Sequence, residues 1–92
     1  MAFKKIEAKI TGIVQGVGFR FYVERMANLL GITGWVKNMY DGSVKVVGIG
    51  TETKIDEFLI TLRKGPSLAR VDNVEYKIED VDYNEYDTFE IY

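Results

Sequence analysis

Two hydrophobic periods follow one another along this chain, and their order limits the folds that it can adopt. Residues 5–10 alternate apolar with charged side chains, which is the period of a strand with one buried face. Residues 23–30 instead carry apolar side chains at i, i+3, i+4 and i+7, which predicts an amphipathic helix. Gly31 is placed to end that helix in a left-handed cap. The sequence therefore begins with a strand that leads into a helix.

A hairpin is expected next, because residues 34–38 and 43–47 flank an Asp41-Gly42 pair, which is typical of a tight turn. Asn38 falls at the end of the first of these two strands.

A second helix should follow the hairpin, with Thr51 as its N-cap and Gly65-Pro66 as its end. Its apolar stripe consists of Ile55, Phe58, Leu59 and Leu62. Alternation then predicts a strand over residues 74–79 and a short last strand over residues 89–92.

This order predicts an α+β fold, the ferredoxin-like split βαβ sandwich. Each helix has a single apolar stripe, so both helices should cover one face of a mostly antiparallel sheet, with a short extra C-terminal strand. No linker or internal repeat interrupts the 92 residues, which predicts one domain over residues 1–92. Trp35, Phe58 and Phe89 are expected in its core.

Composition excludes several kinds of site. The chain has no cysteine and no histidine, which excludes disulfides, thiolate nucleophiles, a histidine-activated serine and metal sites built on either residue. A net charge of -2 argues against a general nucleic-acid partner. The first residues form no continuous apolar run, and no later stretch approaches membrane-spanning length. We therefore expect a cytoplasmic chain with no membrane partner. We also expect it to be a monomer.

The stretch VQGVGFR, residues 14–20, joins the first strand to the first helix. Such a glycine-rich turn presents backbone N–H groups and the positive end of the helix dipole to one point, which suits an anion. Arg20 adds a planar charged fork that matches phosphate or carboxylate oxygens. The alternative is a tight turn beside a solvated surface arginine. A nucleotide is disfavoured, because no Gly-Lys-Ser/Thr ending is present and Phe21 replaces the third glycine of a dinucleotide motif.

VQGVGFR, together with GWVKN at 34–38 and DGSV at 41–44, resembles the acylphosphatase family over nearly the whole chain. The resemblance implies hydrolysis of a small-molecule acyl phosphate without cofactor, metal or covalent intermediate. It further implies that Arg20 and Asn38 are catalytic: Arg20 binds the phosphoryl group and Asn38 positions the attacking water. Inorganic phosphate would be product and inhibitor. The implied phosphate-binding loop consists of Gln15, Gly16, Val17, Gly18, Phe19 and Arg20.

Two other functions stay open at this point. One is a non-catalytic module that binds a small anion or regulates another protein. The other is RNA binding, because GFRFYV at 18–23 faintly resembles an aromatic RNA-binding strand, although here it is expected to open a helix. The acidic segment 80–85 lacks the glycine and glutamate positions of a calcium loop, so a solvated turn is expected there.

Overall fold

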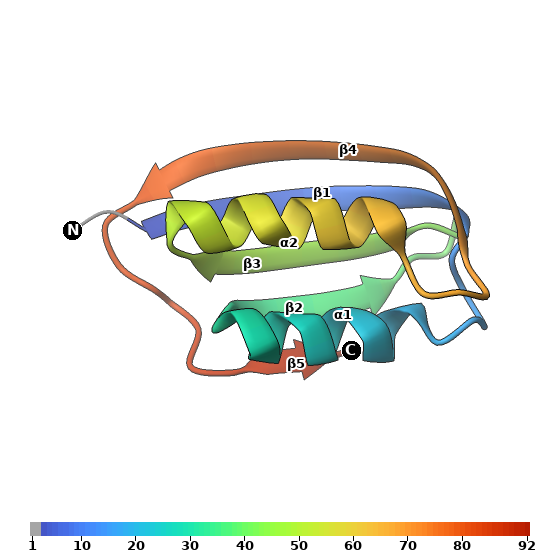
Figure 1. Ribbon diagram of the computed structural model, residues 1–92, viewed down its shortest axis with the longest axis horizontal. Helices are drawn as coiled ribbons and strands as arrows, with labels where there is room; N and C mark the ends of the chain where they lie inside the picture. Colours follow the sequence, from blue (N-terminus) through green and yellow to red (C-terminus); the bar gives the residue numbers. More distant parts are fainter. Residues whose placement is uncertain (1–2) are drawn as a thin grey trace.

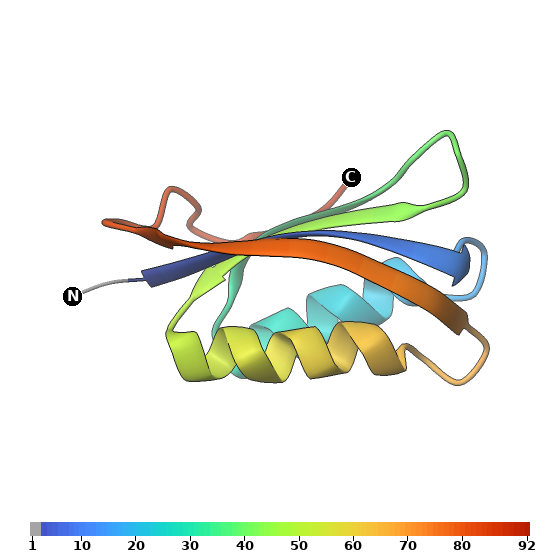
Figure 2. The same cartoon turned by 90° about the horizontal axis from the view of Figure 1, so that it is seen from above.

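Two helices cover one face of a five-stranded sheet in the computed structural model, which describes residues 3–92 (Figures 1 and 2). Met1 and Ala2, the first residues of the expected domain, lie outside the described residues. The elements are β1 (Phe3–Ile13), α1 (Phe19–Leu30), β2 (Thr33–Asn38), β3 (Val44–Gly50), α2 (Glu52–Lys64), β4 (Arg70–Val81) and β5 (Phe89–Ile91). Figure 2 shows α1 and α2 on the same side of the sheet, as predicted.

The sheet has the order β4-β1-β3-β2-β5. All neighbours are antiparallel except β2 and β5, which are parallel, and this confirms a mostly antiparallel sheet with an added C-terminal strand. β1 and β4 are longer than their alternating patterns predicted, and their pairing shifts register between Thr11 and Gly12. A Cβ at Gly12 would lie 2.1 Å from the Arg70 carbonyl oxygen, so only glycine fits at this irregularity beside the glycine-rich turn.

The core lies between the helices and the sheet, as the stripes predicted. α1 buries Phe19, Val23 and Ala27, and α2 buries Ile55, Phe58, Leu59 and Leu62. Gly31 ends α1 in a left-handed conformation with φ 69°, as expected. Thr51 occupies the N-cap position of α2, but its side chain makes no capping hydrogen bond. Within residues 3–92, no helix is both long enough and apolar enough to cross a bilayer.

Trp35 does not belong to this core, and that expectation was wrong. Its neighbours Gly34 and Val36 are buried under the helices, so the strand period directs Trp35 to the opposite face. There Trp35 is half-buried, and its Nε1 donates to the Tyr86 hydroxyl at 3.2 Å. Phe58 and Phe89 are core residues, and their ring centroids lie 6.2 Å apart.

The acidic segment 80–85 leaves the sheet only in part: Asp80 and Val81 still belong to β4, residues 82–85 form the expected turn, and side chains of this turn tie it to the open face of the sheet. The Lys5 Nζ lies 3.0 Å from Glu85 Oε1, and Asn84 Nδ2 donates to Thr33 Oγ1 at 2.6 Å. These contacts lead the chain across the sheet to β5 beside β2 (Figure 1).

Candidate active site

The turn between β1 and α1 is built on two left-handed glycines. Gly16 has φ 75° and Gly18 has φ 76°, which other residues rarely adopt. A Cβ at either position would meet no atom within 4 Å, so the requirement for glycine is conformational and not steric. The side chains flanking the turn point inward: Val14 and Phe19 are both buried. The turn thus leaves its main chain exposed while both of its ends are anchored in the core.

α1 begins at Phe19, so the last two residues of the expected loop already belong to the helix. Phe19 and Arg20 form the first turn of α1, with Gly18 as its N-cap. Because Gly18 has no side chain, it provides no side-chain cap for the first N–H groups, and no acidic residue lies in that turn. α2, in contrast, carries Glu52 in its first turn. No side chain of its own first turn therefore neutralises the positive end of α1, which is the kind of helix end that can bind an anion.

Arg20 lies half-buried beside this helix end. Its Nη1 donates to the main-chain oxygen of Tyr92 at 2.8 Å, which brings the C-terminal residue to the site. Among residues 3–92, no acidic side chain forms an ion pair with Arg20. The contact with Tyr92 holds one arm of the guanidinium and leaves its other donors for a ligand.

Asn38 is brought to the same place by strand geometry. It is the last residue of β2 and lies two positions after the buried Val36, so it shares the face on which α1 packs. Its Oδ1 is buried, and among the described residues it accepts no hydrogen bond. Buried polar atoms are nearly always paired, so this oxygen is placed for a donor from outside the chain.

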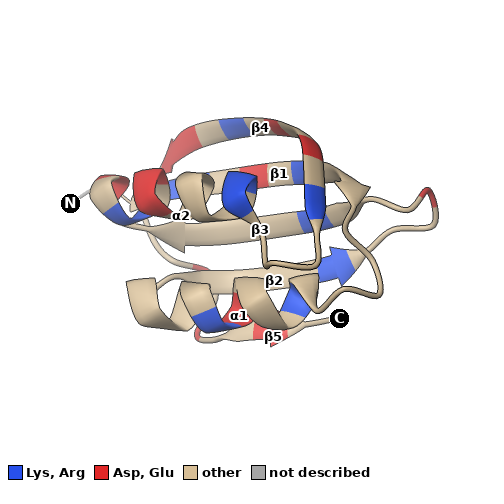
Figure 3. Ribbon diagram, turned by 45° about the vertical axis from the view of Figure 1, so that its right-hand side comes forward, with Lys and Arg blue, Asp and Glu red and all other residues tan. Residues whose placement is uncertain are grey.

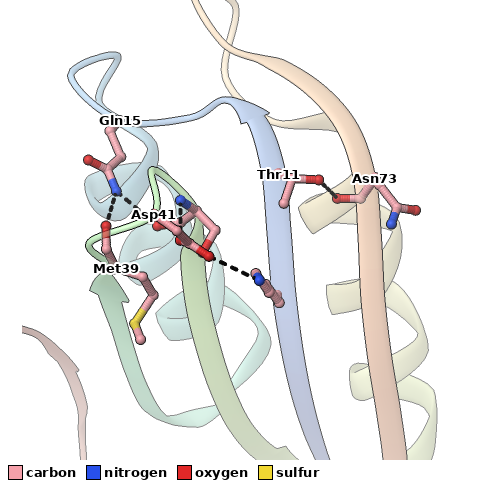
Figure 4. Close-up of polar contacts among 7 residues, drawn as sticks. Thr11, Gln15, Met39, Asp41 and Asn73 are labelled. Atoms are coloured by element: carbon pink, nitrogen blue, oxygen red, sulfur yellow. Dashed lines mark hydrogen bonds and ion pairs between the residues drawn. The ribbon is translucent and has the colours of Figure 1, made fainter.

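The side chain of Gln15 links the expected phosphate-binding loop to the neighbouring hairpin. Its Nε2 donates to the Met39 carbonyl at 2.8 Å and to the Ser43 carbonyl at 2.9 Å, which ties the glycine-rich turn to the β2–β3 turn (Figure 4). Met39 directly follows Asn38. The Gln15 side chain therefore helps to fix the distance between the glycine-rich turn and Asn38.

The β2–β3 turn is itself held by Asp41 (Figure 4). Asp41 Oδ1 accepts from the Ser43 hydroxyl and amide at 2.5 and 3.0 Å, and Asp41 Oδ2 lies 3.0 Å from the Lys9 Nζ. The Ser43 hydrogen bonds and the nearby lysine hold the pKa of Asp41 well below its usual range. Gly42, with φ 90°, completes the turn predicted from the Asp-Gly pair.

A hollow of about 250 Å³ lies where these parts meet. It is lined by Val14, Gly16, Gly18, Phe19, Arg20, Phe21 and Asn38. Of the expected site residues, Gln15 and Val17 do not line it: Gln15 turns to the hairpin, and Val17 packs against the core. Sequence reasoning missed Phe21 and Tyr92. Phe21 follows Arg20 and lies outside the apolar stripe predicted for residues 23–30, which was the available signal for the first, whereas no local pattern points to Tyr92.

The wider surface bears on RNA binding, one of the two alternative functions. GFRFYV forms the start of α1 and not a strand, which removes the feature that suggested RNA binding. Basic and acidic residues alternate along β1 and β4 instead of forming one basic stripe (Figure 3). Within residues 3–92, no three acidic side chains are grouped so that they could hold a metal ion.

Comparison with known proteins agrees with this geometry. The family model described as acylphosphatase matches residues 6–91. An acylphosphatase from Archaeoglobus fulgidus is 43% identical over 86 residues, which are 94% of each chain. The crystal structure of an acylphosphatase from Bacillus subtilis superposes with a TM-score of 0.91 at 28% identity, covering 97% of this chain and 98% of that one. A Coxiella burnetii acylphosphatase structure gives a TM-score of 0.88 at 36% identity, covering 98% and 93%. Sequence and structure together show that this chain belongs to the acylphosphatase family of hydrolases.

Proposed function

We propose that this chain hydrolyses acyl phosphates to a carboxylate and inorganic phosphate by direct attack of water on phosphorus. Family membership supports the reaction class. The single observation that carries the mechanism is the buried Oδ1 of Asn38, which has no hydrogen-bond partner among the described residues; Asn38 lines the same hollow as Arg20 and the N-terminus of α1.

The phosphoryl group would lie against the glycine-rich turn. Gly16, Gly18, Phe19 and Arg20 line the hollow, so their main-chain N–H groups and the free donors of Arg20 would bind its oxygens, and the helix dipole would add to their charge. These donors are fixed before substrate arrives, because Val14 and Phe19 are buried and Gln15 is bonded to the hairpin. Such preorganised groups stabilise the charge of a phosphoryl transition state without rearranging. Inorganic phosphate carries the same anionic group and would inhibit competitively.

Asn38 would position the nucleophile. Its Oδ1 accepts a hydrogen bond from a water molecule and directs the water's lone pair at phosphorus. The leaving group is a carboxylate, which departs without protonation, so no general acid is needed. This fits a chain that has no histidine at all.

The test is an assay of the purified chain with an aromatic acyl phosphate in excess EDTA, beside a phosphate monoester. We expect the acyl phosphate to be cleaved and the monoester, with its poorer leaving group, to survive. A strict need for added magnesium or zinc would contradict the mechanism. Binding of phosphate without any hydrolysis would favour the non-catalytic module instead.

A further inference from the structure

A second, larger hollow of about 630 Å³ adjoins the phosphate hollow along the outer side of α1. Gly18 and Phe21 line both hollows, so the two share a border. Its volume lies in the range of about 300–1,000 Å³ that is common for small-molecule sites. We call it the α1 groove, lined among others by Gly18, Phe21, Tyr22, Arg25, Leu29 and Pro66.

Apolar side chains that the core does not use form the walls of the α1 groove. Phe21 and Leu29 are each 73% exposed, although both are large and apolar. Phe21, Arg25 and Leu29 follow at spacings of four along α1, which places them on one side of the helix. Tyr22 is half-buried, and its hydroxyl donates to the Thr61 carbonyl at 3.0 Å, so it is held against α2. The exposed apolar surface thus begins at the phosphate hollow and runs away from it.

In-line displacement sets the side on which the acyl group must leave. The attacking and leaving oxygens of a phosphoryl transfer lie on roughly opposite sides of phosphorus. Asn38, which we propose to hold the water, lines the phosphate hollow but not the α1 groove. The leaving oxygen would therefore point away from Asn38, and the groove that borders the phosphate hollow at Gly18 and Phe21 is a surface free of Asn38 that the acyl group could reach.

We infer that the α1 groove binds the acyl group of the substrate and favours flat apolar acyl groups, aromatic ones above all; this inference rests on the proposed function. The ring of Phe21 and the side chains of Leu29 and Pro66 suit an aromatic ring. Glu24 and Arg25 also line the groove and carry opposite charges, so an additional charge on the acyl group would gain little. A small group such as acetyl would stay within the phosphate hollow.

The test compares benzoyl phosphate with acetyl phosphate on Leu29→Asp. Leu29 lines only the groove, and its exposure allows the substitution without disturbing the core. We expect the KM for benzoyl phosphate to rise on the order of 5-fold or more, with kcat little changed, because binding remote from the reacting atoms is lost. The KM for acetyl phosphate and inhibition by inorganic phosphate should stay as in the wild type.

Ile60→Asp is the matched control, since Ile60 is 66% exposed on α2 and lines neither hollow. It should leave both substrates unaffected. If the wild type cleaves both substrates but Leu29→Asp leaves the benzoyl KM unchanged, or raises both KM values equally, the acyl-group inference is wrong while the proposed function stands. A wild type that cleaves neither substrate overturns both proposals.

Discussion

Two amide side chains lie at the same end of the sheet and differ in their hydrogen bonding. Gln15 in the glycine-rich turn donates from Nε2 to two main-chain carbonyls, at 2.8 and 2.9 Å. Asn38 at the end of β2 keeps its Oδ1 buried, with no donor among the described residues. The first amide joins two segments of chain, and the second is left open to a ligand.

This difference separates the structural role of Gln15 from the catalytic role that we propose for Asn38. A satisfied amide adds to stability, whereas a buried acceptor without a partner costs about 1–3 kcal/mol. Such an unfavourable buried atom is expected mainly at functional sites, where a ligand supplies its hydrogen bond. We therefore expect substitution of Asn38 to affect turnover and substitution of Gln15 to affect stability.

The largest effect should come from Asn38→Ala. If Asn38 orients water, its interaction matters chiefly in the transition state, and kcat should fall at least on the order of 10²-fold. Inhibition by inorganic phosphate should be nearly unchanged, and the melting temperature should not fall, because an unpaired buried oxygen has been removed. Steady-state kinetics and thermal melting of one preparation measure all three quantities.

Two further variants serve as comparisons for Asn38→Ala. Asn73→Ala removes an exposed carboxamide from β4 at the same end of the sheet and should leave kcat unchanged. Arg20→Lys should weaken inhibition by phosphate, because an ammonium group cannot reproduce the planar fork. A destabilised but fully active Asn38→Ala variant would make Asn38 a turn residue.

Gln15→Met should act mainly on stability. Losing both hydrogen bonds costs about 1–2 kcal/mol, which corresponds to a melting temperature lower by about 5–15 °C in a domain of this size. The loss of kcat should be smaller than for Asn38→Ala, since the turn is also anchored by Val14 and Phe19. A normal melting temperature with a severe loss of kcat would place Gln15 in the chemistry and remove the contrast between the two amides.

Asp41→Asn should have the smallest effect, and its sign depends on pH. The folded protein lowers the pKa of Asp41, so this carboxylate stabilises the fold above its unfolded pKa of about 3.9 and loses that effect as the pH falls below it. The variant should therefore melt slightly below the wild type at pH 7, and the gap should close in acid. Melting curves of both proteins at pH 7 and at a pH below the unfolded pKa test this. A difference in melting temperature that grows in acid would contradict it.

Local patterns were enough to predict most of the fold. The stripes of both helices, the Asp41-Gly42 turn and Gly31 as the end of α1 depend on neighbours within a few residues, and all were confirmed. The prediction that Trp35 lies in the core was wrong because it rested on residue type alone. The strand period directs this side chain to the open face of the sheet.

The site was only partly predictable, because its remaining contacts are distant in sequence. Arg20, Asn38 and both glycines were identified from the motif, and the structure brings them to one hollow. The bond of Gln15 to the β2–β3 turn and that of Arg20 to Tyr92 join positions that no periodicity relates. The unpaired state of Asn38 Oδ1 is likewise a property of packing.

The central claim, attack of water on phosphorus, is tested most directly by hydrolysing the acyl phosphate in ¹⁸O-labelled water and analysing both products by mass spectrometry. Water held by Asn38 and directed at phosphorus should place one labelled oxygen in inorganic phosphate and none in the carboxylate. Label in the carboxylate would mean that the carbon–oxygen bond is cleaved, and it would contradict the roles proposed for Asn38 and the glycine-rich turn.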